Sequence, residues 1–205
     1  MPKSISISNL SKATLDGIIE SMELYNQWSG GEWLCNAPEY LMTVKIAENI
    51  ANIKGDKLIT MEDKVDYILD LSNAIKKGRK PNTLRKNGRI DIVIWNQNDT
   101  PRIIIEVKNN VYRLGKISQD IIRTYQMLKR NQDNSTLEYG IIAFYISNHD
   151  DKGKAKEKLE KQLNKIIDEF KNKFYYISHK EKISDIVELN NNKDAWVSVA
   201  LVIKA

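Results

Sequence analysis

Apolar positions in the first third of the chain recur at intervals of three and four residues, which is the period of an amphipathic helix. This pattern predicts three helices, over residues 13–28, 37–53 and 60–76. Ser11 is placed to cap the first helix, and Thr60-Met61-Glu62-Asp63 opens the third as a variant of the capping box. The first 77 residues are therefore expected to be mainly helical.

Runs of β-branched and aromatic residues follow a basic, turn-rich connector at residues 76–88. Such runs are typical of β-strands. They predict strands over 89–95, 102–108, 139–147, 174–177 and 196–203, with helices over 116–130 and 152–173. The run 139–147 is apolar almost throughout, so we expect it at the centre of the sheet.

This order of elements predicts an α/β fold with a central mixed sheet flanked by helices. The length of 205 residues favours a single domain, residues 1–205, in which a helical N-terminal part (1–77) packs on a sheet-containing core (85–205).

Composition narrows the chemistry available to the protein. A single cysteine, Cys35, excludes a disulfide within the chain, and with only two histidines it makes Cys/His zinc sites improbable. No apolar run reaches the roughly 18 residues that span a bilayer, and the N-terminus has no secretory signal, so we expect a cytoplasmic protein without a membrane partner. The net charge of +5 is compatible with a polyanionic partner.

Asp91 interrupts the otherwise apolar first strand of the hairpin, and Glu106 and Lys108 interrupt the second. Residues two apart on a strand share a face, so Glu106 and Lys108 should point the same way. A symmetric hairpin would pair Trp95 with Arg102 and Val93 with Ile104, and would place Asp91 opposite Glu106. A bulge would instead put the two carboxylates on different faces.

Two carboxylates opposite each other repel, and folding alone does not call for them on apolar strands. A divalent cation would relieve the repulsion, because Mg²⁺ takes one or two carboxylates together with waters and substrate phosphate oxygens. The ammonium of Lys108 beside them could orient a water or stabilise a transition state. The pattern therefore indicates hydrolysis of phosphodiester bonds.

Asp91, fourteen intervening residues and then Glu106-Val107-Lys108 resemble the motif of the PD-(D/E)xK nuclease superfamily, which has the restriction-endonuclease-like fold. The resemblance covers about residues 38–147, and it departs from the motif in having Ile90 rather than proline before Asp91. It implies Asp91 and Glu106 as ligands of Mg²⁺, for which Mn²⁺ can substitute, with the Val107 carbonyl as a further ligand. It also implies Lys108 as the catalytic lysine and Glu39, on the upstream helix, as an extra ligand or orienting residue.

In that superfamily the helix after the motif commonly faces the active site or the nucleic acid. Here this helix carries a polar stripe, so the candidates for nucleic-acid contact are Lys116, Gln119, Arg123 and Gln126, with Arg130 continuing the stripe. The stripe could equally be the solvated face of the helix. The basic run 76–86 could contact phosphates or form a solvated loop, and the lysine-rich helix 152–173 reads first as a solvated face.

The function implied is Mg²⁺-dependent hydrolysis of nucleic acid, with DNA as the expected substrate and restriction or phage defence as a suitable setting. Cutting both strands of a duplex needs two sites, which would suit a homodimer. One alternative is a catalytically inactive nucleic-acid-binding or assembly protein on the same fold, and another is a structural module whose hairpin carries an ordinary salt bridge. Glu39 could also be a first-turn acid that complements the helix dipole, and Cys35 has no evident partner histidine.

Overall fold

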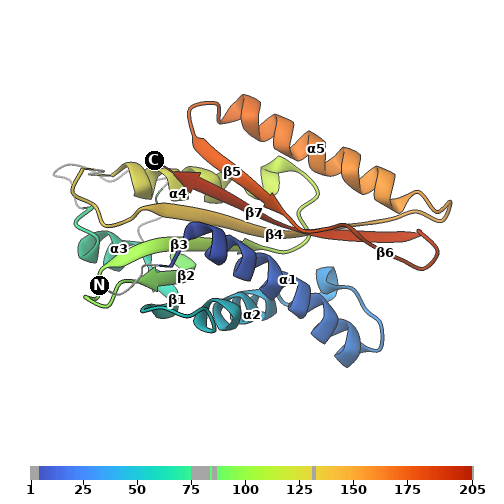
Figure 1. The fold of residues 1–205 in the computed structure, drawn as a ribbon. Helices are drawn as coiled ribbons and strands as arrows, with labels where there is room; N and C mark the ends of the chain where they lie inside the picture. Colours follow the sequence, from blue (N-terminus) through green and yellow to red (C-terminus); the bar gives the residue numbers. More distant parts are fainter. Residues whose placement is uncertain (1–4, 75–83, 85–86, 131–132, 205) are drawn as a thin grey trace.

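A seven-stranded mixed sheet forms the middle layer of the protein in a computed structural model that describes residues 5–74, 84, 87–130 and 133–204 (Figure 1). The strands are β1 (Leu58–Lys64), β2 (Arg89–Trp95), β3 (Pro101–Lys108), β4 (Tyr139–His149), β5 (Ser178–Ile183), β6 (Val187–Leu189) and β7 (Asp194–Lys204). Their order across the sheet is β1-β2-β3-β4-β7-β5, and β6 pairs with β7. Strands β3 and β4 are parallel, whereas the other described pairs are antiparallel.

Helices cover both faces of this sheet (Figure 1). One face carries α1 (Ile7–Ser29) and α2 (Glu39–Ala51), with the short 3₁₀ helix η1 (Leu34–Asn36) between them in sequence. The other face carries α3 (Val65–Leu71), α4 (Ser118–Lys129) and α5 (Ala155–Lys173), and the 3₁₀ helix η3 (Leu114–Lys116) leads into α4. The predicted α/β class, with a mixed sheet between helices, is confirmed.

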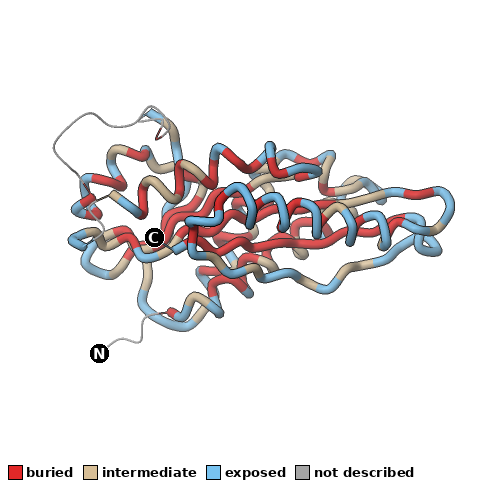
Figure 2. The backbone as a smooth tube through the Cα atoms, turned by 90° about the horizontal axis from the view of Figure 1, so that it is seen from above, coloured by how far each residue is buried: buried red, intermediate tan, exposed pale blue. Residues whose placement is uncertain are grey.

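Side-chain alternation along the strands divides the apolar residues between two cores. Ile92 and Ile105 pack with α1 and α2, whereas Val93 and Ile104 pack with α3, α4 and α5. Because the middle strands are buried on both faces (Figure 2), they read as nearly continuous apolar runs. The prediction that the strand beginning at Tyr139 is central is confirmed, since β4 lies between β3 and β7.

The helix predicted over residues 60–76 is wrong, because its first part is the edge strand β1 and α3 begins only at Val65. The Thr60 hydroxyl bonds to the Asp63 carboxylate, side chain to side chain rather than to the backbone as in a capping box, and the backbone there is extended and pairs with β2. Pairing with a buried neighbour outweighs the local helical signal. The sheet therefore begins within the first 77 residues.

The strand predicted over residues 174–177 is also wrong, because this segment is a turn after α5 and the strand follows at Ser178. Phe174 and Ile177 are buried against α5, so their apolar character reflects packing rather than strand pairing. Strand β5 is mostly polar because it lies at an edge of the sheet. At the other end of the chain, Ser6 rather than Ser11 caps α1, and the Ser11 hydroxyl bonds to Ile7 O inside the helix.

The basic run 76–86 lies outside the described residues except for Leu84, which is buried. Among the described helices, none combines the length and the apolar character needed to cross a membrane.

Candidate functional site

The hairpin of β2 and β3 brings the first predicted residue of the site, Asp91, beside the end of β3. The predicted pairing of Val93 with Ile104 is confirmed, but a bulge at Ile94/Trp95 pairs Trp95 with Pro101 instead of Arg102. The ladder ends at the pair Ile92 and Ile105, one step before Asp91 and Glu106. Beyond this point a side chain of β2 bonds to the backbone of β3, because Asp91 Oδ2 accepts a hydrogen bond of 2.6 Å from Val107 N.

Glu106 is almost completely buried, with 1% of its surface exposed. Its Oε1 lies 2.5 Å from Nη2 of Arg123, but neither carboxylate oxygen has a well-aligned hydrogen bond among the described residues. Burial raises the pKa of Glu106 to about 8, against the lowering effect of Arg123, and the neighbouring Asp91 raises it further. A buried carboxyl oxygen without a hydrogen-bond partner is costly for folding, and Glu106 Oε2 is such an oxygen among the described residues.

Arg123 belongs to a buried ion pair rather than to an exposed stripe. It is 7% exposed and contacts Asp120 Oδ1 at 3.2 Å as well as Glu106. The prediction of direct nucleic-acid contact by Arg123 therefore meets a structural obstacle, because the neighbours of its guanidinium are protein carboxylates. Lys116 and Gln119 are exposed, and Gln126 is half-buried.

The sequence reasoning missed Asp120, although a signal was present. Asp120 and Arg123 stand three residues apart on a helix, where side chains of opposite charge meet. The sequence pattern placed Arg123 on a stripe facing either nucleic acid or solvent and gave Asp120 no role, because the apolar residues alone defined the inner face. The buried face of α4 is wider than those residues indicate and includes Asp120, Arg123 and Thr124.

Lys108 is held by Glu39, which the structure places at the site. Lys108 Nζ lies 3.0 Å from Glu39 Oε1, and Asn109 N donates to Glu39 Oε2 at 2.8 Å. Burial lowers the pKa of Lys108, but the charges of Asp120, Glu39 and Asp91 outweigh it, so the pKa is raised. Lys108 is therefore an ammonium ion at neutral pH.

Strand alternation predicts that Lys108 and Glu106 point to the same face of the sheet, but their contacts lie on opposite faces. Glu106 meets α4, but Lys108, two residues later, bonds to α2 on the opposite face of the sheet. Lys108 is the last residue of β3, where the sheet no longer separates the two helical layers. Asn109 closes this end, because its Nδ2 donates to Leu34 O and Ala37 O and fixes the start of α2 against β3.

A third acid, Glu62, lies in the same row of the sheet as Asp91. The pairs Met61 with Ile92 and Asp63 with Ile90 bracket Glu62 and Asp91 as opposed residues of β1 and β2. Burial raises the pKa of Asp91, and the charge of Glu62 adds to this effect. The sequence could not indicate Glu62, because the segment around it reads as the start of a helix.

The residues present fit a hard divalent cation better than a transition metal. Among the described residues, no three His, Cys, Asp or Glu side chains converge closely enough to hold an ion by themselves. Asp91 and Glu106 nevertheless offer two carboxylates, one with an unpartnered buried oxygen. Two carboxylates completed by water and substrate oxygens are the ligand set that Mg²⁺ uses.

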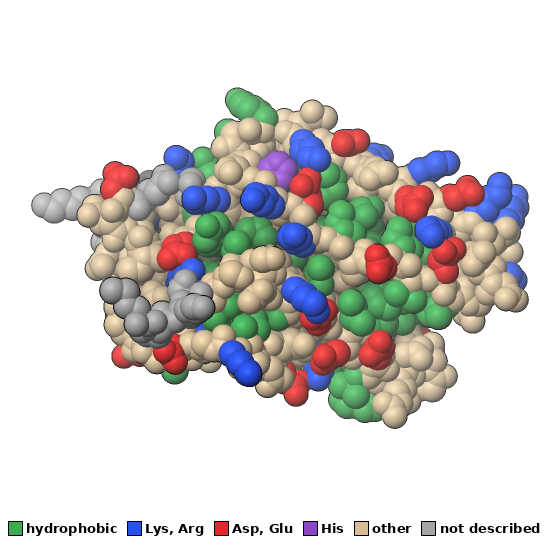
Figure 3. Space-filling model, viewed as in Figure 1, with side chains coloured by type: hydrophobic (Ala, Val, Ile, Leu, Met, Phe, Trp, Pro, Cys, Tyr) green, Lys and Arg blue, Asp and Glu red, His purple; other side chains and the backbone are tan. Residues whose placement is uncertain are grey.

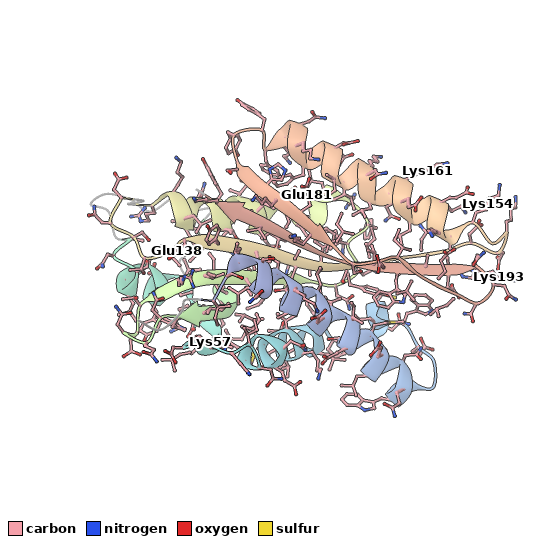
Figure 4. All side chains as sticks on the ribbon, viewed as in Figure 1. Lys57, Glu138, Lys154, Lys161, Glu181 and Lys193 are labelled. Atoms are coloured by element: carbon pink, nitrogen blue, oxygen red, sulfur yellow. The ribbon has the colours of Figure 1, made fainter. Side chains whose placement is uncertain are left out.

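Charged side chains on the face seen in Figure 3 do not form a single basic surface among the described residues. On the face seen in Figure 3, the described lysines and arginines are interspersed with aspartates and glutamates. Lys161 lies along α5 and Lys154 at its start (Figure 4). This mixture agrees with the first interpretation of the lysine-rich helix as a solvated face.

A separate pocket of about 350 Å³ brings Cys35 and His149 together, which the sequence did not indicate. His149 Nδ1 contacts Asp194 Oδ1 at 2.6 Å, and its Nε2 lies 3.2 Å from Asp151. The Cys35 thiol instead contacts the side chain of Asn36. This histidine is thus oriented by carboxylates and is not hydrogen-bonded to the thiol.

Comparisons of the chain with protein-family models, curated proteins and solved structures find no match.

Proposed function

We propose that the protein is a metal-dependent phosphodiesterase whose site lies at the end of β3. The observation that carries this proposal is the buried carboxylate of Glu106, whose Oε2 has no described partner while Asp91 and Lys108 stand beside it. An arrangement so costly for folding is best explained by a cation that binds there. Within this class, the protein is proposed to be a nuclease of the PD-(D/E)xK type that acts on DNA.

The order of the elements around the site supports this proposal. Helix α2 precedes the antiparallel strands β1, β2 and β3, helix α4 follows, and β4 then pairs in parallel with β3. This arrangement agrees with the helix, strands and helix that the PD-(D/E)xK resemblance implies. Asp91, Glu106, Lys108 and Glu39 come together in the structure from three different elements.

The proposed chemistry assigns a separate role to each side chain. Asp91 and Glu106 would hold Mg²⁺, or Mn²⁺ in its place, with the Val107 carbonyl as a further ligand. The bound ion would supply Lewis-acid polarisation of the phosphate and a more acidic water. Lys108 stays protonated because Glu39 and Asp120 surround it with negative charge, so it orients water and stabilises developing negative charge rather than removing a proton. Glu39 positions Lys108.

The test is cleavage of supercoiled plasmid and of single-stranded DNA in Mg²⁺ or Mn²⁺. Glu106→Gln and Lys108→Met keep the size of each side chain while removing its charge, and each is expected to abolish metal-dependent cleavage. Glu160→Gln and Lys161→Met, on the solvated face of α5, are the matched controls and should cleave as the unmodified protein does.

Folding of each variant is checked by circular dichroism. Equal cleavage by the unmodified protein and Glu106→Gln would contradict the assigned site. Metal binding without cleavage of either substrate would favour the inactive nucleic-acid-binding protein.

A further inference from the structure

The segment directly after Lys108 presents one aromatic ring and two cations to solvent. Tyr112 is 46% exposed. The guanidinium carbon of Arg113 lies 5.4 Å from the centre of its ring, and Lys116 Nζ lies 5.1 Å from it. Arg113 and Lys116 are both exposed. We call Tyr112, Arg113 and Lys116 the Tyr112 platform.

This platform is held rigidly by the residues between its members. Val111 is fully buried and its N–H donates to Tyr145 O on β4, while Leu114 is 4% exposed. Gln162 of α5 donates to the Tyr112 carbonyl, and Lys116 N donates to Arg113 O. Tyr112 is thus exposed because Val111 and Leu114 on either side of it are buried in the protein.

Of the four other exposed tyrosines among the described residues, all but Tyr40 pack against another aromatic ring. Tyr67 packs against Trp95, and Tyr175 and Tyr176 pack against each other. The described contacts of the Tyr112 ring are with Arg113 and Lys116 alone. A ring beside two exposed cations is a surface that a flat, electron-rich group joined to an anion would fit.

We infer that the Tyr112 platform binds an unpaired nucleotide next to the cleavage site, so that the substrate is engaged as a single strand. The inference deepens the proposed function and rests on it. A base would stack on Tyr112 while its flanking phosphates pair with Arg113 and Lys116. In a duplex the base faces are covered by their neighbours, so the ring could not reach one.

The position of the platform fits this role. Tyr112 is the fourth residue after Lys108, so their Cα atoms are at most about 14 Å apart. A strand whose phosphate lies at Lys108 would therefore pass the platform within a few nucleotides.

The experiment measures binding of a fluorescent single-stranded oligodeoxynucleotide by anisotropy in EDTA, where no cleavage occurs. The matching duplex and the same sequence as RNA are measured alongside. The unmodified protein should bind the single strand more tightly than the duplex. Tyr112→Ala should weaken single-strand binding by roughly 5- to 150-fold, which corresponds to the loss of one stacked base.

Two further variants separate stacking from folding and charge. Tyr112→Phe keeps the ring and should bind as the unmodified protein does, whereas Tyr175→Ala, at an exposed tyrosine in the turn after α5, should have no effect. Replacing Arg113 and Lys116 by glutamine should lower the slope of log affinity against log salt by about 1.4, because two phosphate contacts are lost.

Equal binding by Tyr112→Ala and Tyr175→Ala, or tighter binding to the duplex, would overturn the inference. Tighter binding to RNA than to DNA, again reduced by Tyr112→Ala, would support the platform and assign RNA as its strand. The proposed function fails separately, if Glu106→Gln cleaves as well as the unmodified protein.

Discussion

At the scale of single residues, Glu106 is a buried acid whose loss of hydration is only partly compensated by an ion pair. Among the described residues its ion-pair partner is Arg123, which Asp120 shares. Burial therefore dominates, and the pKa of Glu106 rises to about 8. The same burial that makes this acid expensive in the free protein would strengthen its hold on a cation.

This pKa predicts how stability depends on pH in the absence of metal. The folded protein retains a proton on Glu106 up to about pH 8, whereas an ordinary glutamate loses it near 4.5. Protonation of Glu106 therefore stabilises the folded state, by an amount on the order of a few kcal/mol. This contribution is fully present below pH 4.5 and is lost as the pH rises through 8. Urea unfolding in EDTA at pH 5.5 and 8.5 should show a smaller loss for Glu106→Gln than for the unmodified protein. Parallel losses in both proteins would contradict the assignment.

Mg²⁺ should reverse this trend, because the cation competes with the proton for Glu106. We expect its affinity to increase as the pH rises toward 8 and its binding to release a proton. Calorimetry in two buffers of different ionisation enthalpy measures that proton. Glu106→Gln should bind Mg²⁺ weakly and without proton release, and Glu160→Gln should match the unmodified protein. Binding that is independent of pH would exclude Glu106 as a ligand.

At the scale of elements, the site depends on how two helices are fixed against the end of β3. Glu39 ties α2 to Lys108 and Asn109, and Arg123 ties α4 to Glu106. Each tie joins a helix to one strand, so helix packing and the geometry of the site are coupled.

Removing Arg123 should leave two buried carboxylates without their cation. Arg123→Met is expected to lower the free energy of unfolding by about 3–5 kcal/mol at pH 8, as for other broken buried ion pairs. Combining it with Glu106→Gln should restore part of this loss, because the uncompensated charge is gone. A double-mutant cycle by urea unfolding measures the coupling, and additive effects would show that the two side chains do not interact.

Gly17 allows α1 to approach α2 closely. A Cβ at Gly17 would lie 2.6 Å from the backbone Cα of Ile46, so one helix must move. Gly17→Ala should destabilise the protein by about 1–3 kcal/mol and should weaken the hold of Glu39 on Lys108. Gly115→Ala is the matched control, because its Cβ would meet only the Arg113 side chain at 3.8 Å or more. Thermal unfolding distinguishes them, and equal melting temperatures would contradict the close packing.

At the scale of the whole molecule, the two cores share one sheet. Ile92 and Val93 are neighbours on β2 yet belong to different cores. Neither helical layer can lose its packing without exposing one face of the same strands. The N-terminal helices are therefore expected to unfold together with the rest.

This shared sheet predicts a single cooperative transition. Far-ultraviolet circular dichroism follows both helical layers, and tryptophan fluorescence follows Trp33 on one face and Trp95 on the other. The two probes should give coincident urea curves. An early loss of helix before the fluorescence change would show that the part formed by α1 and α2 unfolds separately.

The sequence by itself determined the strands whose residues are buried on both faces, because continuous β-branched runs have few alternative structures. It therefore located β2 at residues 89–95 and identified β4 as central. It also singled out Asp91, Glu106 and Lys108, since charges within such runs stand out. Glu39 entered only through the family resemblance, and its contact with Lys108 could not be derived from spacing.

Only the tertiary structure decided the remaining features, because they depend on partners distant in sequence. Leu58–Lys64 became a strand because β2 offers it an edge, against a helical local pattern. Arg123 and Asp120 became buried because Glu106 lies beneath α4, although neither is apolar. Charged residues that are buried as ion pairs look like surface residues in the hydrophobic pattern of a sequence. The sequence therefore could not indicate that Asp120 and Arg123 of α4 lie beside Glu106.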